Sequence, residues 1–172
     1  MRYLGFVPLA ALAACGGGGE NETKAAAADA LRAGQYEVTA EATQFRQADE
    51  GEAAINMAVG TREVRSVCIG DTAPPELFAA EGLTCRRGTS DYMRGGTISS
   101  TYSCTVEGHP GSVALTVSGT YGEDSFEATR NLRSAFVGQG DVVADARLTG
   151  RRTGDCTPAP EGGNTAAPAN TN

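Results

Sequence analysis

Cysteine is the residue type with the most distinctive chemistry in this chain. Cys15 lies at the end of an apolar leader, and Cys68, Cys85, Cys104 and Cys156 lie further along. A zinc site of four cysteines usually contains close Cys-x₂₋₄-Cys pairs, and no two cysteines here are that near to each other. Four cysteines in an exported domain are more typical of two disulfides. The sequence therefore predicts a β domain held by two disulfides, with free thiols or a metal site as the alternatives.

The leader before Cys15 is typical of an exported protein. Its apolar run, Leu4 to Ala14, is too short to cross a hydrocarbon core, which needs about 20 residues in a helix. The sequence Leu12-Ala13-Ala14-Cys15 resembles the lipobox of bacterial lipoproteins, in which the leader is cut before the cysteine. The resemblance implies a signal peptide at residues 1–14, acyl chains such as palmitate on Cys15, and an outer-membrane location facing the periplasm. A plain secretory signal is the alternative.

Residues that could do catalysis are scarce. His109 is the only histidine and lies in the turn-like sequence Gly108-His109-Pro110-Gly111, which offers no orienting partner for a general base. No Gly-x-Ser-x-Gly nucleophile elbow or strand-to-helix phosphate loop occurs. The acidic run Asp49-Glu50-Gly51-Glu52 lacks the spacing of a calcium loop and is interpreted as a solvated turn. We therefore expect no enzyme activity, no metal and no cofactor.

The net charge limits the partners. At a formal charge of −7 the chain would be repelled by a polyanion, so we expect no nucleic-acid partner. The sequence contains no Trp and 23 Gly, which indicates a modest, turn-rich domain rather than a large helical core. The expected partners are the membrane, through acylated Cys15, and either an envelope protein or an apolar ligand.

Alternation of apolar and polar residues predicts that most of the chain is β-strand, with one face of each strand buried. Two strands are predicted to flank Arg94-Gly95-Gly96. The fold class is all-β: an antiparallel meander of six or seven strands, curled into a half-barrel, a closed barrel or a sandwich. The residues that carry the pattern are Tyr36, Val38, Ala40 and Ala42; Val64, Val67 and Ile69; Ile98, Ser100, Tyr102, Cys104 and Val106; Val113, Leu115, Val117, Gly119 and Tyr121; Phe126, Ala128, Leu132 and Phe136; and Val142, Ala144, Ala146, Leu148 and Gly150.

The domain boundaries follow from composition. Residues 15–34 are predicted to be a flexible tether with a short Ala-rich helix at Lys24–Ala33. The β domain covers residues 35–156, with a helix of one or two turns at Pro74–Ala80. Residues 157–172 lack apolar periodicity and are expected to be disordered.

The hairpin turn bears on the cysteine pairing. If Arg94 and Gly95 are the two central turn residues, Cys85 falls directly opposite Cys104. A cross-strand disulfide there would leave Cys68 to pair with Cys156. A turn of three residues would shift the register by one residue and remove this coincidence. The alternative is the sequential pairing, Cys68–Cys85 with Cys104–Cys156.

Arg130 falls on the apolar register of its strand, between Ala128 and Leu132. Either it faces the concave side of the sheet with a carboxylate or a ligand anion nearby, or a β-bulge turns it outward. A curled sheet can also hold an acyl or other apolar ligand, although such side chains can equally fill the core. The residues that would line such a site are Tyr36, Ile98, Tyr102, Leu115, Tyr121, Phe126 and Arg130. We expect a non-catalytic structural or binding module, with a carrier of an apolar ligand as the alternative.

Four segments together carry a family resemblance. They are Arg32–Val38, Val67–Ile69, the Gly hairpin flanked by Cys85 and Cys104, and Gly150–Cys156. These segments are similar to an uncharacterised family of Gram-negative envelope proteins, domain of unknown function 3617, over about Leu31 to Cys156. Gln35-Tyr36 stands where many members carry a Trp, and an acidic loop replaces the usual Met-rich one. The resemblance implies an architecture and a cellular location but no mechanism.

Overall fold

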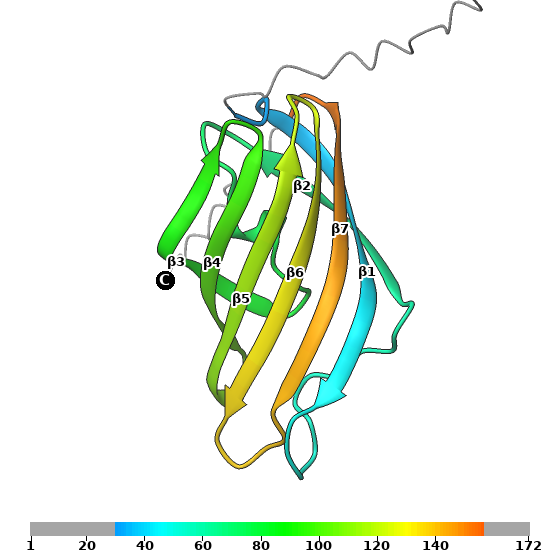
Figure 1. Cartoon of the computed structure of the whole chain (residues 1–172), viewed down its shortest axis with the longest axis vertical. Helices are drawn as coiled ribbons and strands as arrows, with labels where there is room; N and C mark the ends of the chain where they lie inside the picture. The colour runs from blue at the N-terminus through cyan, green and yellow to red at the C-terminus, as the bar shows by residue number, and fades with distance from the viewer. Residues whose placement is uncertain (1–29, 157–172) are drawn as a thin grey trace, which may run out of the picture.

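The computed structural model describes residues 30–156 and consists of seven β-strands with one short 3₁₀ turn (Figure 1). The signal peptide, Cys15, most of the tether and the C-terminal tail predicted above lie outside these residues. The elements are β1 (Gly34–Gln47), β2 (Arg62–Ile69), η1 (Pro75–Leu77), β3 (Leu83–Arg94), β4 (Thr97–Val106), β5 (His109–Tyr121), β6 (Ser125–Phe136) and β7 (Val142–Gly154).

All seven strands form one antiparallel sheet in the order β2-β1-β7-β6-β5-β4-β3. The sheet is curled, so that β2 passes behind β6 and β7 in Figure 1, but it does not close, and β2 and β3 are its edges. The predicted all-β antiparallel meander is therefore confirmed, in its open form. No helix in the described part of the chain is long and apolar enough to cross a membrane.

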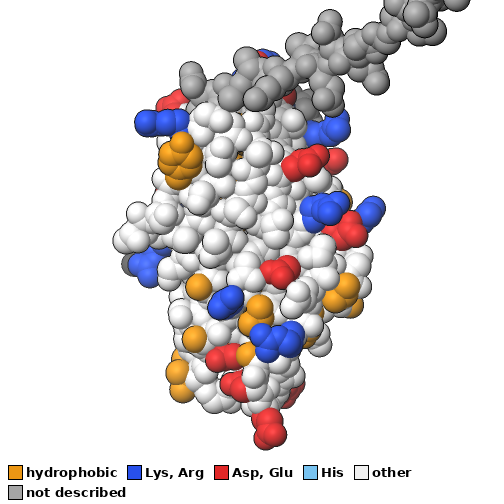
Figure 2. Space-filling model, in the orientation of Figure 1, with side chains coloured by type: hydrophobic (Ala, Val, Ile, Leu, Met, Phe, Trp, Pro, Cys, Tyr) orange, Lys and Arg blue, Asp and Glu red, His pale blue; other side chains and the backbone are white. Residues whose placement is uncertain are grey.

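Alternation along most of the strands separates a buried concave face from an exposed convex face. In β4, for example, Ile98, Ser100, Tyr102 and Cys104 are buried, while the residues between them are mostly exposed. In the upper half of the face in view in Figure 2, the middle is largely free of hydrophobic and charged side chains, which lie along the margins. Most outward residues of β4 and β5 are hydroxyl-bearing, with Ala114 as an exception: Thr97, Ser99, Thr101, Ser103, Thr105, Ser112, Thr116, Ser118 and Thr120.

The edge strand β2 departs from the predicted pattern. Val64 points outward, with 60% of its surface exposed, whereas Glu63, Arg65 and Val67 lie on the more buried face. Grouping Val64 with Val67 was wrong, because residues three apart in a strand lie on opposite faces. The consequence is that β2 presents two charged side chains to the inside of the curled sheet.

The connection between β2 and β3 covers the concave face. Leu77 and Phe78 are fully buried, and the Phe78 ring lies 5.4 Å from Phe126 and 6.1 Å from Tyr102, measured between ring centroids. The one- or two-turn helix predicted here is a single 3₁₀ turn, begun by Pro75. The other predicted helix, Lys24–Ala33, falls mostly outside the described residues, and its last four residues are not helical.

The β3–β4 hairpin pairs Cys85 with Cys104, but with a different turn from the one predicted. Gly95 and Gly96 are the two central residues, both at positive φ (59° and 76°), and Arg94 pairs with Thr97. A tight two-residue turn of this kind needs positive φ at both positions, which Gly adopts without steric cost. A β-bulge between Arg87 and Asp91 then shifts the register by two residues. The bulge brings Cys85 back opposite Cys104, where the two form a disulfide.

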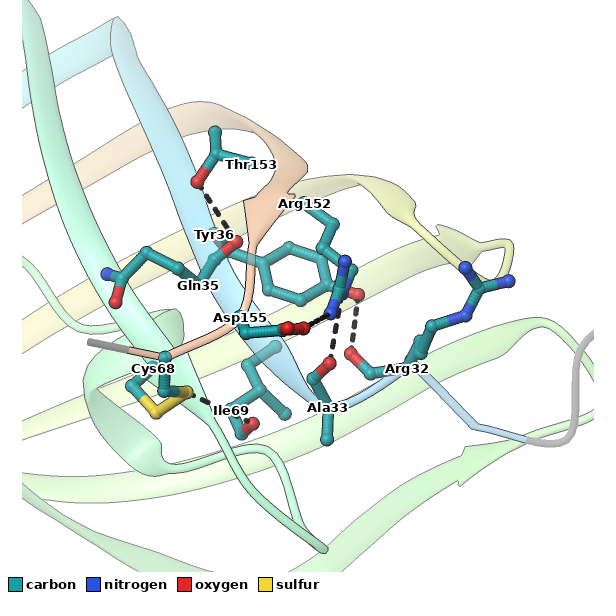
Figure 3. Close-up of a disulfide and its surroundings, with 10 residues drawn as sticks. Arg32, Ala33, Gln35, Tyr36, Cys68, Ile69, Arg152, Thr153 and Asp155 are labelled. Carbon is teal, nitrogen blue, oxygen red and sulfur yellow. Dashed lines mark hydrogen bonds and ion pairs between the residues drawn. A yellow bond between two sulfur atoms is a disulfide. The ribbon is translucent and has the colours of Figure 1, made fainter. Parts of the chain in front are cut away.

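The second disulfide joins Cys68 at the end of β2 to Cys156, just after β7 (Figure 3). Around it, Arg152 Nε donates to Ala33 O at 2.9 Å, and Tyr36 Oη donates to Arg32 O at 2.9 Å. The disulfide and these hydrogen bonds join the edge strand β2, the residues just before β1 and the end of β7 to one another. The cysteines are thus joined in the first of the two pairings expected from the sequence.

Candidate functional site

The open seam of the sheet contains a groove of about 730 Å³ between β2 and β3. Its walls are the segment 54–63, which leads into and includes the start of β2, and residues 80–83 at the start of β3. Val106 at the end of β4 and Leu132 of β6 also line it, so the groove reaches the concave face of the sheet. Large apolar side chains contribute much of the lining: Ile55, Met57, Leu83, Val106 and Leu132.

The connection between β1 and β2 forms one wall because it is held against the β6–β7 connection. Gly140 N donates to Glu52 O at 3.0 Å, and Asp141 N donates to the Asp49 carboxylate at 2.6 Å. Ala53 bridges to Gly140 as an isolated β-pair. The acidic run predicted to be a solvated turn therefore anchors this wall through Asp49.

The six side chains predicted to line an apolar site belong instead to the packed core. Tyr36, Ile98, Tyr102, Leu115, Tyr121 and Phe126 are between 0% and 6% exposed, and none of them lines the groove. Phe78, from the β2–β3 connection, occupies the concave side between Tyr102 and Phe126. The space available to a ligand lies at the seam, not in the centre of the curled sheet.

Arg130 faces the concave side. It pairs with Val117 and Ala146 in unbroken register on both neighbouring strands, so no bulge turns it outward, and it is 2% exposed. Its Nη1 donates to Phe78 O at 3.2 Å. Within residues 30–156 it forms no ion pair with a carboxylate. Burial, and then the nearby charge of Arg65, lower the pKa of Arg130 to about 10.

Glu63 and Arg65 of β2 complete a charged cluster with Arg130. Arg65 Nη1 lies 2.9 Å from Glu63 Oε1, and Arg65 Nη2 donates to Leu77 O at 3.2 Å. The Nε of Arg65 is buried without a hydrogen-bond partner among the described residues. The cluster thus has two guanidinium groups and one carboxylate, which pairs with Arg65, and it carries a net charge of +1.

A small cavity of about 40 Å³ touches Arg130 and Glu63. Met57, Thr61 and Glu63 line both this cavity and the large groove, so the two spaces adjoin. Arg130 is the one predicted site residue found at this seam. The sequence analysis did not identify the groove residues of the segment 54–63, because the mostly apolar run Ala53–Met57 has neither strand nor helix periodicity. An apolar run in a connection between two strands could still have indicated a binding surface.

His109 lies at the start of β5, near the far end of the β6–β7 connection. Its Nδ1 is 2.7 Å from Gln139 Oε1, and its ring centroid is 6.1 Å from that of Phe136. Among the residues described, no group of three or more His, Cys, Asp and Glu side chains is arranged to hold a metal ion. These contacts hold the start of β5 against the end of β6 and the β6–β7 connection.

The fold and its two disulfides define a class: an open, curled, seven-stranded all-β domain whose edges are fastened by cross-links. A family model, described as a protein of unknown function (DUF3617), matches residues 31–156. The chain belongs to this family, as the resemblance in the sequence predicted. No curated protein and no solved structure matches the chain.

Proposed function

We propose that this protein is a lipid-anchored, periplasm-facing component of the bacterial envelope, and that its β domain is a non-catalytic binding module for an apolar ligand. The leader ending at Cys15 supports the anchor. Two disulfides fit an oxidising compartment, since such bonds persist outside the cytosol.

The seam groove is the observation that carries the binding role. Its volume of about 730 Å³ falls within the roughly 300–1,000 Å³ usual for ligand pockets, and large apolar side chains line it. The core behind it is filled, so a ligand would occupy the groove without displacing the packed aromatic residues. An envelope protein that inserts an apolar side chain is the second occupant this surface suits.

Intact mass of the protein extracted from membranes tests the anchor. We expect a chain that begins at residue 15 and carries the added mass of a diacylglycerol and an acyl chain on Cys15. An unprocessed leader, or an unmodified Cys15, would contradict the lipoprotein proposal.

Binding of the neutral fluorescent probe N-phenylnaphthylamine tests the groove, using the chain secreted without its anchor. We expect saturable binding that Met57→Glu weakens, because this substitution places a charge in the apolar lining. Val64→Glu is the matched control, since Val64 is an exposed apolar residue on the outer face of β2. No saturable binding, or equal losses in the two variants, would count against the groove as a ligand site.

A further inference from the structure

We infer that the seam is a site for a carboxylate-headed amphiphile, such as a long-chain fatty acid, with the alkyl chain in the groove and the carboxylate at Arg130. This inference rests on the apolar-ligand role proposed above and names the chemical class of that ligand. It combines three observations: an uncompensated buried charge, a small space beside it, and the apolar groove that the space adjoins.

The first observation is the buried charge. Arg130 is 2% exposed, and its Nη1 donates a hydrogen bond to a neutral acceptor, Phe78 O. Removing a guanidinium from water costs several kcal/mol unless a counter-ion and further hydrogen bonds compensate it. Glu63 is the one carboxylate of the cluster, and Arg65 already pairs with it. The cluster therefore lacks one negative charge.

The second observation is the space beside Arg130. The cavity of about 40 Å³ is a few times the roughly 10–15 Å³ of cavity volume that one water needs. Ala40 and Ala42 of β1 line it, and Ala146 of β7 pairs with Arg130, so small side chains leave this room. A planar carboxylate suits a volume of this size better than a tetrahedral phosphate, which has more oxygens to place.

The third observation is that the polar space adjoins the apolar one. Met57, Thr61 and Glu63 line both the cavity and the groove, so a ligand that spans the two would pass among these three side chains. The planar guanidinium fork matches a carboxylate with two parallel hydrogen bonds. Thr61, which carries a hydroxyl, is one of the residues at this junction. An anionic head at Arg130 with an apolar tail in the groove would satisfy both halves of the site.

The test is displacement of N-phenylnaphthylamine by dodecanoate and by dodecanol, which have the same chain length and differ in the charge of the head. We expect dodecanoate to bind about tenfold or more tightly than dodecanol, because a hydrogen bond to a charged group contributes more than a neutral one. In Arg130→Met the two ligands should bind alike, with dodecanol affinity close to that of the unsubstituted protein. In Arg130→Lys, which keeps the charge but loses the fork, the preference should be smaller but present.

Arg133→Met is the matched control, because Arg133 lies on the same strand and is exposed on the outer face. It should keep the full preference for dodecanoate. Equal binding of both ligands to the unsubstituted protein would overturn the carboxylate site while leaving the apolar groove in place. Loss of the preference in Arg133→Met as well would overturn it too, since general surface charge would then explain the effect. Failure of the probe and of both ligands to bind would overturn the groove and the carboxylate site together.

Discussion

The Cys68–Cys156 disulfide should stabilise the domain more than the Cys85–Cys104 disulfide. The first bond joins residues 88 apart in sequence, and the second joins residues 19 apart. In the chain-entropy model, closing loops of these lengths in the unfolded chain stabilises the folded state by about 4.6 and about 3.2 kcal/mol respectively at 25 °C. The difference of about 1.4 kcal/mol corresponds to roughly tenfold in the folding equilibrium constant.

The positions of the two bonds in the sheet support the same order. Cys85 and Cys104 lie opposite each other in a hairpin whose strands are already joined by a two-residue turn. Cys68 lies on the edge strand β2, which pairs with β1 alone, and it is tied to residues beyond β7. Without this bond, the β1 ladder would be the one strand pairing that holds β2 in the sheet.

Two double variants, Cys68→Ala/Cys156→Ala and Cys85→Ala/Cys104→Ala, each retain one bond. Urea unfolding of each variant, oxidised and reduced, gives the contribution of the retained bond without the packing cost of the alanines, which matters because Cys104 is fully buried. Sulfate in the buffer raises the stability of all forms, which helps to keep the reduced proteins folded. We expect the larger oxidised-minus-reduced difference for the variant that retains Cys68–Cys156. An equal or smaller difference would refute the loop-length argument.

Two further predictions concern packing and pH. Gly150→Ala should lower the free energy of unfolding by about 1–3 kcal/mol, because its new Cβ would overlap the buried Phe126 ring. The control is Gly70→Ala, which should not destabilise the domain because the space around Gly70 is open. Urea midpoints measure both, and equal effects would contradict the packing argument. Burial of the Tyr102 ring raises the pKa of its hydroxyl above 10, so the unfolded chain releases this proton first and stability falls as pH rises past 10. Tyr102→Phe should reduce that decline between pH 9 and 11, and an unchanged slope would show that Tyr102 does not contribute to it.

The sequence predicted the strands well because one face of the sheet is buried along most of its length. In such a sheet, a shift of one residue would expose every inward side chain, so the apolar pattern specifies the facing of each strand. The exception is β2, where Val64 points outward and Arg65 inward. At this edge, pairing with Glu63 and with a carbonyl of the β2–β3 connection lets a charged residue take an inward position. Those partners are distant contacts, which alternation alone does not reveal.

The hairpin shows how a correct contact can follow from an incorrect register. Placing the turn at Arg94-Gly95 put Cys85 opposite Cys104, and the true turn at Gly95-Gly96 alone would have separated them. The bulge before Asp91 restores the pairing. Its Gly88 lies so close to Thr101 of β4 that an added Cβ would collide with it. A bulge of this kind depends on the packing of two strands, so propensities within one strand do not indicate it.

Arg130 was the most informative residue in the sequence, because it interrupts an apolar register that the neighbouring residues otherwise keep. Both of its neighbouring ladders are regular, so Arg130 keeps the inward position, and its charge is buried without an ion pair among the described residues. Replacing a buried charged group with an apolar side chain of similar volume is often neutral or stabilising, so the fold alone gives no reason for an arginine at this position. The adjoining cavity and groove supply such a reason. A buried positive charge that lowers the stability of the ligand-free domain would raise its affinity for an anionic ligand.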